Sequence, residues 1–204
     1  MAITRRLALT ATVGGLTGYA APGAWIPLFD GTSLKGWKET PFRGHGEVTI
    51  KDSTIIIGKG KMTGITWTGD FPKSGYEIRF EAARLEGKDF FAGITFPVKE
   101  SFCSWINGGW DGTVVGLSSL DGDDASENDT STARDFVTGR WYSFRVVVTD
   151  DRIRCWIDEK DVIDADIKGR RVGLRPGETE LCAPLGFASY ATVGGLRKME
   201  YRLL

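Results

Sequence analysis

The sequence has almost no net charge. Its 204 residues include 26 Lys and Arg against 27 Asp and Glu, which gives a formal net charge of −1 at pH 7. A chain without a basic excess creates no overall field that attracts nucleic acid, and no cluster of Lys and Arg interleaved with aromatic residues compensates for this. We therefore expect no nucleic-acid partner.

Cysteine and histidine are scarce. The chain has three cysteines, Cys103, Cys155 and Cys182, and a single histidine, His45. None of them has the C-x-x-C or Cys/His spacing of a zinc site, and His45 is far from every cysteine in sequence. Because each cysteine stands among apolar residues, we expect buried free thiols; in an exported protein, one disulfide between two of them is the alternative.

Long apolar runs are also absent, apart from one short segment at the N-terminus. Arg5 and Arg6 precede residues 7–20, which contain no charged side chain. A basic start followed by a short apolar stretch that ends in alanine is typical of an export signal, and paired arginines are compatible with the twin-arginine type. The stretch is shorter than the roughly 20 residues of a membrane-spanning helix. We expect residues 1–20 to direct export to the periplasm or the outside of the cell, or to anchor the chain; a tail of a cytoplasmic protein is the alternative.

From Trp25 onward the sequence lacks the 3.6-residue hydrophobic period of helices. Short runs rich in Val, Ile, Phe, Tyr and Trp lie between polar breaks and many of the 27 glycines, a pattern typical of strands. In residues 76–84, Tyr, Ile, Phe and Ala alternate with Glu and Arg, which predicts a strand with one buried and one wet face. Residues 141–148 and 152–157 alternate in the same way.

The strand pattern predicts one domain over residues 25–204 with about a dozen strands. Residues 90–96 are apolar at both alternating positions, as in a strand that is covered on both faces or lines a groove. The closing segment 194–204 is expected to pair near the first strand. The predicted fold class is all-β, a two-sheet antiparallel jelly-roll sandwich of the lectin and glucanase type.

One stretch suggests a family. Residues 25–37, WIPLFDGTSLKGW, resemble the opening signature of the 3-keto-disaccharide hydrolase family. Further pieces follow in the same order at residues 76–81, 91–94, 139–142, 152–158 and 185–188, so the resemblance covers essentially all of 25–204. It implies a concanavalin A-like jelly roll, usually exported from bacteria, that acts as a 3-keto-glycoside 1,2-lyase or as a hydratase of the resulting 2-hydroxy-glucal.

The signature itself is expected to be structural. Asp30 and Gly31 suit a tight turn, and Ser33 can cap it. The apolar residues around this turn are expected to pack onto the sandwich: Trp25, Leu28, Phe29, Leu34 and Trp37.

The implied reaction determines which groups the site must contain. A ketone at C3 acidifies the proton at C2, so that a base can remove this proton and the substituent at C1 can leave by elimination. The enzyme needs a general base near C2, a donor or cation for the enolate oxygen and an acid near the leaving group. A divalent ion could serve the enolate, although nothing in the sequence requires a cofactor. The expected partner is a small carbohydrate.

The acidic segment 108–129 is where we expect part of the site. Its last nine residues hold five carboxylates, but the EF-hand order fails because Ala125 stands where the third ligand belongs. Most of these carboxylates are therefore expected to hold a solvated loop. Trp110 and Asp111 follow two glycines, which allow a ligand to approach closely, and the pair Glu127 and Asn128 is the second candidate.

The sequence thus predicts His45, Glu127 and Asp111 as catalytic residues. His45 or Glu127 would take the C2 proton, since an unperturbed histidine titrates near neutral pH. The predicted substrate-binding residues are Trp110 under the sugar ring, Asn128, Arg43 beside the enolate, and Phe91 and Thr95 on the outward face of their strand, with Phe90, Ala92, Ile94 and Phe96 in the core.

Two other classes of function fit the same residues. The first is a non-catalytic carbohydrate-binding sandwich, with Trp105, Trp110 or Trp156 as the sugar platform. The second is an interaction module tied to a membrane by residues 1–20.

Overall fold

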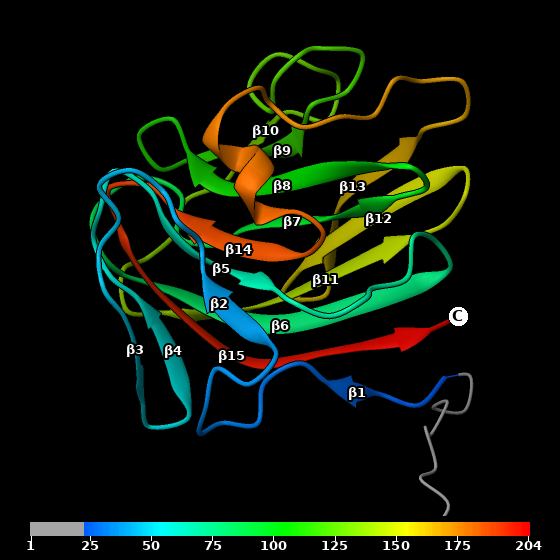
Figure 1. Cartoon of the computed structure of the whole chain (residues 1–204). Coiled ribbons are helices and arrows are strands. Elements are labelled where there is room, and N and C mark those ends of the chain that lie inside the picture. Colours follow the sequence, from blue (N-terminus) through cyan, green and yellow to red (C-terminus); the bar gives the residue numbers. More distant parts are fainter. Residues whose placement is uncertain (1–22) are drawn as a thin grey trace, which may run out of the picture.

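The computed structural model describes residues 23–204, so the expected export signal at 1–20 lies outside the described residues. Two antiparallel β-sheets are stacked face to face, as Figure 1 shows, and confirm the predicted sandwich. The strands are β1 (Ile26–Pro27), β2 (Trp37–Glu39), β3 (Val48–Lys51), β4 (Thr54–Ile57), β5 (Thr63–Trp67), β6 (Tyr76–Glu86), β7 (Gly93–Val98), β8 (Ser101–Gly109), β9 (Val114–Ser118), β10 (Thr132–Ala133), β11 (Trp141–Val148), β12 (Arg152–Ile157), β13 (Lys160–Asp166), β14 (Gly186–Ser189) and β15 (Val193–Leu203). A single 3₁₀ helix, η1 (Glu178–Cys182), is the only helical element in this range.

The eight-stranded sheet has the order β13-β12-β11-β6-β15-β4-β3, with β1 paired to β15. The seven-stranded sheet has the order β10-β9-β8-β7-β14-β5-β2. The pairing of Ile26 with Tyr201 confirms that the closing segment lies beside the first strand. No helix within residues 23–204 has the length and apolar character needed to cross a bilayer.

The core lies between the sheets and follows from the alternation in the strands. Along β6 the apolar series that begins at Tyr76 is buried, and the register places Phe80 opposite Phe144 of β11. These two rings stack with centroids 5.0 Å apart, and Phe187 of the opposite sheet meets Phe80 edge-on at 4.9 Å. Aromatic pairs of this geometry add about 0.5–1.5 kcal/mol beyond the burial of their area.

The opening signature folds as a capped turn. Asp30 accepts hydrogen bonds from the backbone N–H groups of Thr32 and Ser33, and the side chain of Ser33 together with these donors holds the pKa of Asp30 well below its usual value. The indole of Trp37 donates to the carbonyl of Leu28 at 2.6 Å, deep in the core.

Four of the five apolar residues of the signature pack as predicted, with Leu28 and Trp37 in the core and Phe29 and Leu34 against it. The prediction for Trp25 is wrong, because its ring lies on the outer face of the eight-stranded sheet beneath Arg79.

One strand begins later than the alternation suggests. The chain bends after β6, and β7 starts only at Gly93. The predicted outward orientation of Phe91 is therefore wrong: its side chain is fully buried and meets Phe136 edge-on in the core. Phe90 is instead the residue that lies outside the core, while Thr95 faces outward as predicted and hydrogen-bonds Ser104 at 2.7 Å.

The three cysteines are free and buried, and none forms a disulfide. Desolvation raises the pKa of Cys103 and Cys182 to about 12 and raises that of Cys155 well above its usual value. These thiols are protonated near neutral pH, so none of them is a ready nucleophile.

Candidate functional site

Where η1 lies, the outer face of the seven-stranded sheet carries small side chains such as Thr66 and Ala188, which allow this segment to lie close to it. Figure 1 shows η1 and the loop before it crossing this face over β14 and β8. A side chain at Gly186 would come within 2.6 Å of the carbonyl oxygen of Cys182, so the glycine permits this close approach. Thr66 donates to the carbonyl of Leu181 at 2.9 Å and fastens η1 to β5.

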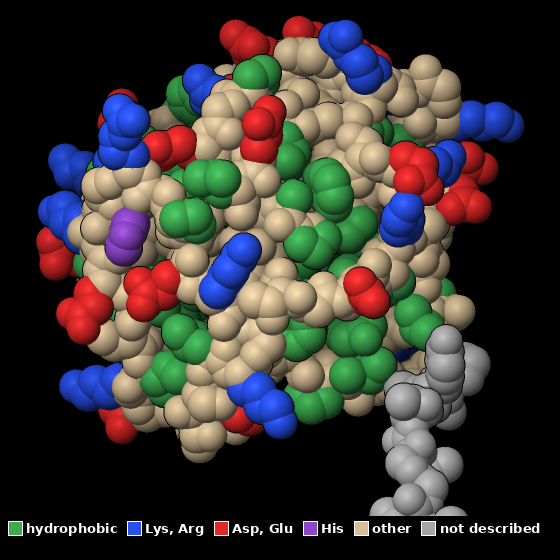
Figure 2. All heavy atoms as spheres, in the orientation of Figure 1, with side chains coloured by type: hydrophobic (Ala, Val, Ile, Leu, Met, Phe, Trp, Pro, Cys, Tyr) green, Lys and Arg blue, Asp and Glu red, His purple; other side chains and the backbone are tan. Residues whose placement is uncertain are grey.

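Beside η1 this face is hollowed into what we call the aromatic groove. It consists of a deep cavity of about 290 Å³ and a shallow one of about 220 Å³, which share four residues. The shared residues are Phe90, Trp110, Arg175 and Tyr190. In the same view, Figure 2 shows hydrophobic side chains across the middle of the molecule and most charged side chains around its rim.

The aromatic wall is built by turns at the ends of strands. Trp110 follows β8 in a left-handed turn with φ of 48°, closed by a hydrogen bond from the N–H of Gly112 to the carbonyl of Gly109. The N–H of Tyr190 donates to the carbonyl of Phe90, and the two rings stack with centroids 6.1 Å apart. Trp110 is 40 % exposed and Tyr190 39 %, so both rings remain open to a ligand.

An ion pair forms part of the deep cavity. The guanidinium of Arg175 lies 2.8 Å from Oδ2 of Asp124, and 6.0 Å from the ring of Trp110. Oδ1 of Asp124 accepts hydrogen bonds from the hydroxyl of Ser118 and from the N–H of Ala125, both at 2.7 Å. Both oxygens of Asp124 are therefore occupied, and the carboxylate fixes the position of Arg175.

Glu178, the first residue of η1, is the other carboxylate of the deep cavity. Its Oε1 accepts a hydrogen bond from the backbone N–H of Arg43 at 3.2 Å. Among residues 23–204 no cation pairs with it, so one carboxylate oxygen is available to a ligand.

The three residues predicted as catalytic lie outside the groove lining. His45 is exposed, and its Nδ1 lies 2.9 Å from the carbonyl of Gly46. Asp111 is exposed beside Trp110, and Glu127 is exposed in the acidic loop. Of the predicted residues only Trp110 lines the groove, and the catalytic roles of the other three stay predictions.

Two predicted binding residues have structural positions. Asn128 is buried, and its amide donates to the carbonyls of Leu117, Asp123 and Asp124 while its oxygen accepts from Thr130. With these partners it has no group left for a substrate. Arg43 is exposed and touches the site through its backbone N–H rather than through its guanidinium.

The acidic loop is held mainly by arginine. Asp121 accepts a hydrogen bond from the backbone N–H of Arg171 and pairs with Arg170 at 2.8 Å, and these contacts lower the pKa of Asp121. Arg170 also pairs with Asp129 at 3.0 Å. Within residues 23–204 no group of three His, Cys, Asp or Glu side chains is arranged to hold a metal ion.

The sequence analysis missed several residues of the groove: Phe90, Asp124, Arg175, Glu178 and Tyr190. One signal could have pointed to two of them. Arg175 and Glu178 lie in the connection between β13 and β14, which spans residues 167–185. Connections of this length in a compact domain are often functional.

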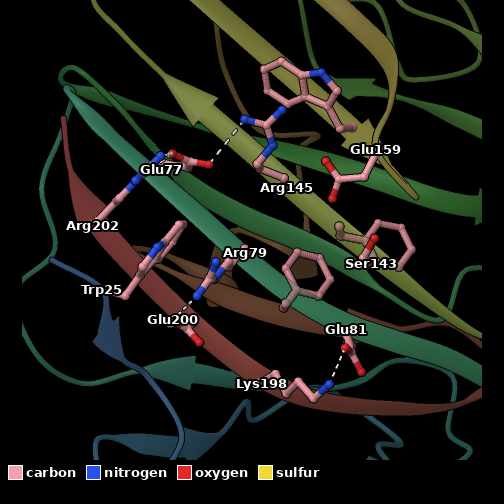
Figure 3. Close-up of a pocket in the computed structure, with 13 residues that line it drawn as sticks. Trp25, Glu77, Arg79, Glu81, Ser143, Arg145, Glu159, Lys198, Glu200 and Arg202 are labelled. Atoms are coloured by element: carbon pink, nitrogen blue, oxygen red, sulfur yellow. Dashed lines mark hydrogen bonds and ion pairs between the residues drawn. The ribbon is translucent and has the colours of Figure 1, made fainter. Parts of the chain in front are cut away.

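A larger hollow of about 510 Å³ lies on the outer face of the eight-stranded sheet. Figure 3 shows Glu77 between Arg145 and Arg202, and Glu81 beside Lys198. Because most charged side chains there are already paired with one another, the hollow offers a ligand few free groups. We therefore take the aromatic groove as the candidate site.

Comparisons with solved structures show that other proteins share the fold of this sandwich. The apo Crh5 transglycosylase superposes with a TM-score of 0.60 at 15 % identity, covering 91 % of this chain and 85 % of that one. A provisionally assigned glycosyl hydrolase from Parabacteroides distasonis gives 0.57 at 14 %, covering 88 % and 94 %. The carbohydrate-binding module CBM66 from Bacillus subtilis gives 0.52 at 11 %, covering 82 % and 95 %. At these identities the likeness shows the fold alone.

Comparison with curated protein sequences gives no match. The sequence profile of one family matches residues 24–181, which is most of the chain and includes the opening signature, and this confirms the resemblance noted from the sequence. The chain therefore belongs to the family of 3-keto-alpha-glucoside-1,2-lyase-like domains.

Proposed function

We propose that the aromatic groove binds a 3-keto-glycoside and cleaves it by elimination between C2 and C1. One observation carries this proposal: an available carboxylate, Glu178, and a fixed cation, Arg175, line the same deep cavity as the open aromatic rings. A base and a positive group are what the elimination needs near C2 and the C3 oxygen. Membership of the lyase-like family supports the same chemistry.

In the proposed first step the carboxylate of Glu178 takes the proton from C2. The electron pair of the C2–H bond moves into a C2–C3 double bond, and the negative charge develops on the C3 oxygen. In the second step the C3 carbonyl re-forms, a C1–C2 double bond forms, and the bond from C1 to the leaving oxygen breaks. A leaving alkoxide recovers its proton from the carboxyl of Glu178, so the products are an alcohol and a 3-keto-2-hydroxy-glucal.

Arg175 is proposed to stabilise the enolate oxygen. A guanidinium carries five N–H donors, of which the pair with Asp124 leaves others free. Asp124 is then a positioning residue, because both of its oxygens are engaged by the protein. A cation already held in place costs little reorganisation when charge develops.

A second candidate function is binding of carbohydrate without catalysis. The observation in its favour is that, among residues 23–204, only two carboxylates line the deep cavity, and both oxygens of Asp124 are engaged, so that Glu178 alone remains for proton transfer. An aromatic wall with few titratable neighbours is sufficient for a sugar-binding site.

The proposal is tested by incubating the full chain with a 3-keto-α-glucoside and with 3-keto-trehalose, with and without EDTA, and following the products by NMR. Release of the leaving alcohol together with a glucal supports elimination. Glu178→Gln is expected to slow this release by about 10²–10⁴-fold, whereas the matched variant Glu180→Gln, on the exposed side of η1, keeps the parent rate. Binding without turnover by the parent protein would contradict the lyase proposal and support the second candidate.

A further inference from the structure

The two parts of the aromatic groove differ in chemistry. The deep cavity contains hydroxyls and carboxylates, among them Ser104, Ser118 and Glu178. The shallow cavity is lined by three aromatic rings, Arg175 and Asp89. We infer that the shallow cavity is a subsite for a planar aromatic aglycone, so that the substrates are aryl glycosides. This inference deepens the proposed function and rests on it in one respect, namely that the aryl glycosides are cleaved and not only bound.

The first argument concerns hydrogen bonds. A sugar ring carries hydroxyls around its whole edge, and each one that is buried without a partner costs about 1–3 kcal/mol. Among residues 23–204, the charged lining of the shallow cavity is limited to Asp89, whose Oδ1 accepts a hydrogen bond from the N–H of Phe90 at 2.7 Å, and Arg175, which is paired with Asp124 through one N–H group. These two side chains cannot pair all the hydroxyls of a second sugar, whereas an aromatic ring has none to lose.

The second argument concerns the geometry of the rings. Phe90 and Tyr190 stack at 30° to one another, and Trp110 completes the wall. Trp110 and Tyr190 are two of the five large hydrophobic residues exposed within residues 23–204, and both lie at this one place. Aromatic pairs prefer offset stacking or edge-to-face contact, and a group of open rings offers both to a flat ligand.

The third argument concerns the leaving group. Arg175, the charged residue that both cavities share, is assigned to the enolate oxygen at C3. Within residues 23–204 the lining of the shallow cavity contains no second cation to stabilise the leaving oxygen. A phenolate suits such a site, because a phenol has a pKa of about 10, far below that of an aliphatic alcohol, and it departs with less assistance.

The binding test uses the full chain and two glucosides that keep their C3 hydroxyl and are not cleaved by the elimination. Calorimetric titration with phenyl α-glucoside is expected to give roughly tenfold tighter binding than with methyl α-glucoside, from the stacking contacts. Trp110→Ala and Tyr190→Ala should remove most of this ratio, while Tyr190→Phe, which keeps the ring, should preserve it. Leu181→Ala, at an exposed position of η1 outside the groove, is the control. Equal affinity for the two glucosides would overturn the inference.

A kinetic arm separates this inference from the proposed function. Phenyl 3-keto-α-glucoside is expected to be cleaved at least about tenfold faster than 3-keto-trehalose. Equal rates, unchanged by Trp110→Ala, would overturn the aryl subsite and leave the elimination standing. A preference for the phenyl glucoside in binding, with no release of phenol from its 3-keto form, would support the subsite and overturn the elimination.

Discussion

The outer faces of the two sheets use the same residue types in opposite ways. On the eight-stranded sheet, tryptophan rings are covered by arginine, with Arg79 3.8 Å from the ring centre of Trp25 and Arg145 3.7 Å from that of Trp156. In the aromatic groove of the seven-stranded sheet, Trp110 is 40 % exposed and its nearest guanidinium lies 6.0 Å away.

The difference follows from where the residues stand in the strands. Arg145 and Trp156 are direct neighbours in the register of β11 and β12, so the arginine lies across the ring of its partner. Trp110 and Tyr190 instead follow the ends of β8 and β14, where no neighbouring strand supplies a cover. A paired face stabilises the fold, whereas an unpaired aromatic wall can bind a ligand.

The largest expected effect tests which face does chemistry. Glu178→Gln is expected to lower the rate of 3-keto-glycoside cleavage by about 10²–10⁴-fold, the usual loss for a general base. Glu159→Gln, in the hollow of the eight-stranded sheet, is expected to leave the rate unchanged. NMR rates for the two variants measure this, and the reverse result would move the site to the other face.

The next effect tests whether the charged face stabilises the fold. Glu77 is 3 % exposed and pairs with Arg145 and Arg202, each 35 % exposed. Removing one partner of a buried ion pair lowers the free energy of unfolding by about 3–5 kcal/mol. Because the arginines here reach solvent, we expect Glu77→Gln to lower it by about 2–3 kcal/mol. Urea denaturation measures this loss, with Glu159→Gln as a control within about 0.5 kcal/mol of the parent. Equal losses for both would contradict a special role of Glu77.

A pair of tryptophan variants sharpens the comparison further. Trp110→Ala is expected to weaken glycoside binding by up to about tenfold, equivalent to about 1.4 kcal/mol, with little change in stability. Trp156→Ala is expected to lower the stability and to leave glycoside binding unchanged, because its ring packs under Arg145 and Arg154 on the other sheet. Titration and thermal unfolding of both variants check this, and a loss of binding in Trp156→Ala would remove the distinction between the faces.

The smallest expected effect is a dependence on pH. Desolvation raises the pKa of Glu81, but hydrogen bonds from Lys198 and Arg197 outweigh it, and the net pKa is lowered. Glu81 therefore stabilises the fold above its unfolded pKa of about 4.3, and this contribution disappears as the pH falls through the folded value. Glu81→Gln is expected to lower the free energy of unfolding by up to about 1 kcal/mol at pH 7. Below pH about 4 this free energy is expected to decline less steeply in the variant than in the parent. The free energy of unfolding is measured by urea denaturation at several pH values. An equally steep fall of this free energy with decreasing pH in parent and variant would contradict the prediction.

The strands were predictable because alternation is a local property. Residues on β6, β11 and β12 face the core or solvent as their sequence pattern predicts. The prediction failed at Phe91, where a bend before β7 interrupts the alternation and reverses the side chain. Short apolar segments do not reveal such a bend, because both faces of the pattern are hydrophobic.

The site was less predictable because its residues are far apart in the sequence. Trp110 was identified from its glycine-rich approach, but Asp124, Arg175, Glu178 and Tyr190 reach the groove only through the packing of η1 and the loops on β14 and β8. His45 was predicted as catalytic because it is the single histidine, yet it does not line the groove. The type of a side chain does not reveal where the fold places it.

By itself the sequence determined which side of each regular strand is apolar, and with it the sandwich and the turn at Asp30, because these depend on neighbours a few residues away. Only the tertiary structure decided that Trp25 is covered by Arg79 while Trp110 is left open, and that Glu178 and Arg175 line the same cavity. Such juxtapositions depend on contacts between distant segments, which no local pattern encodes.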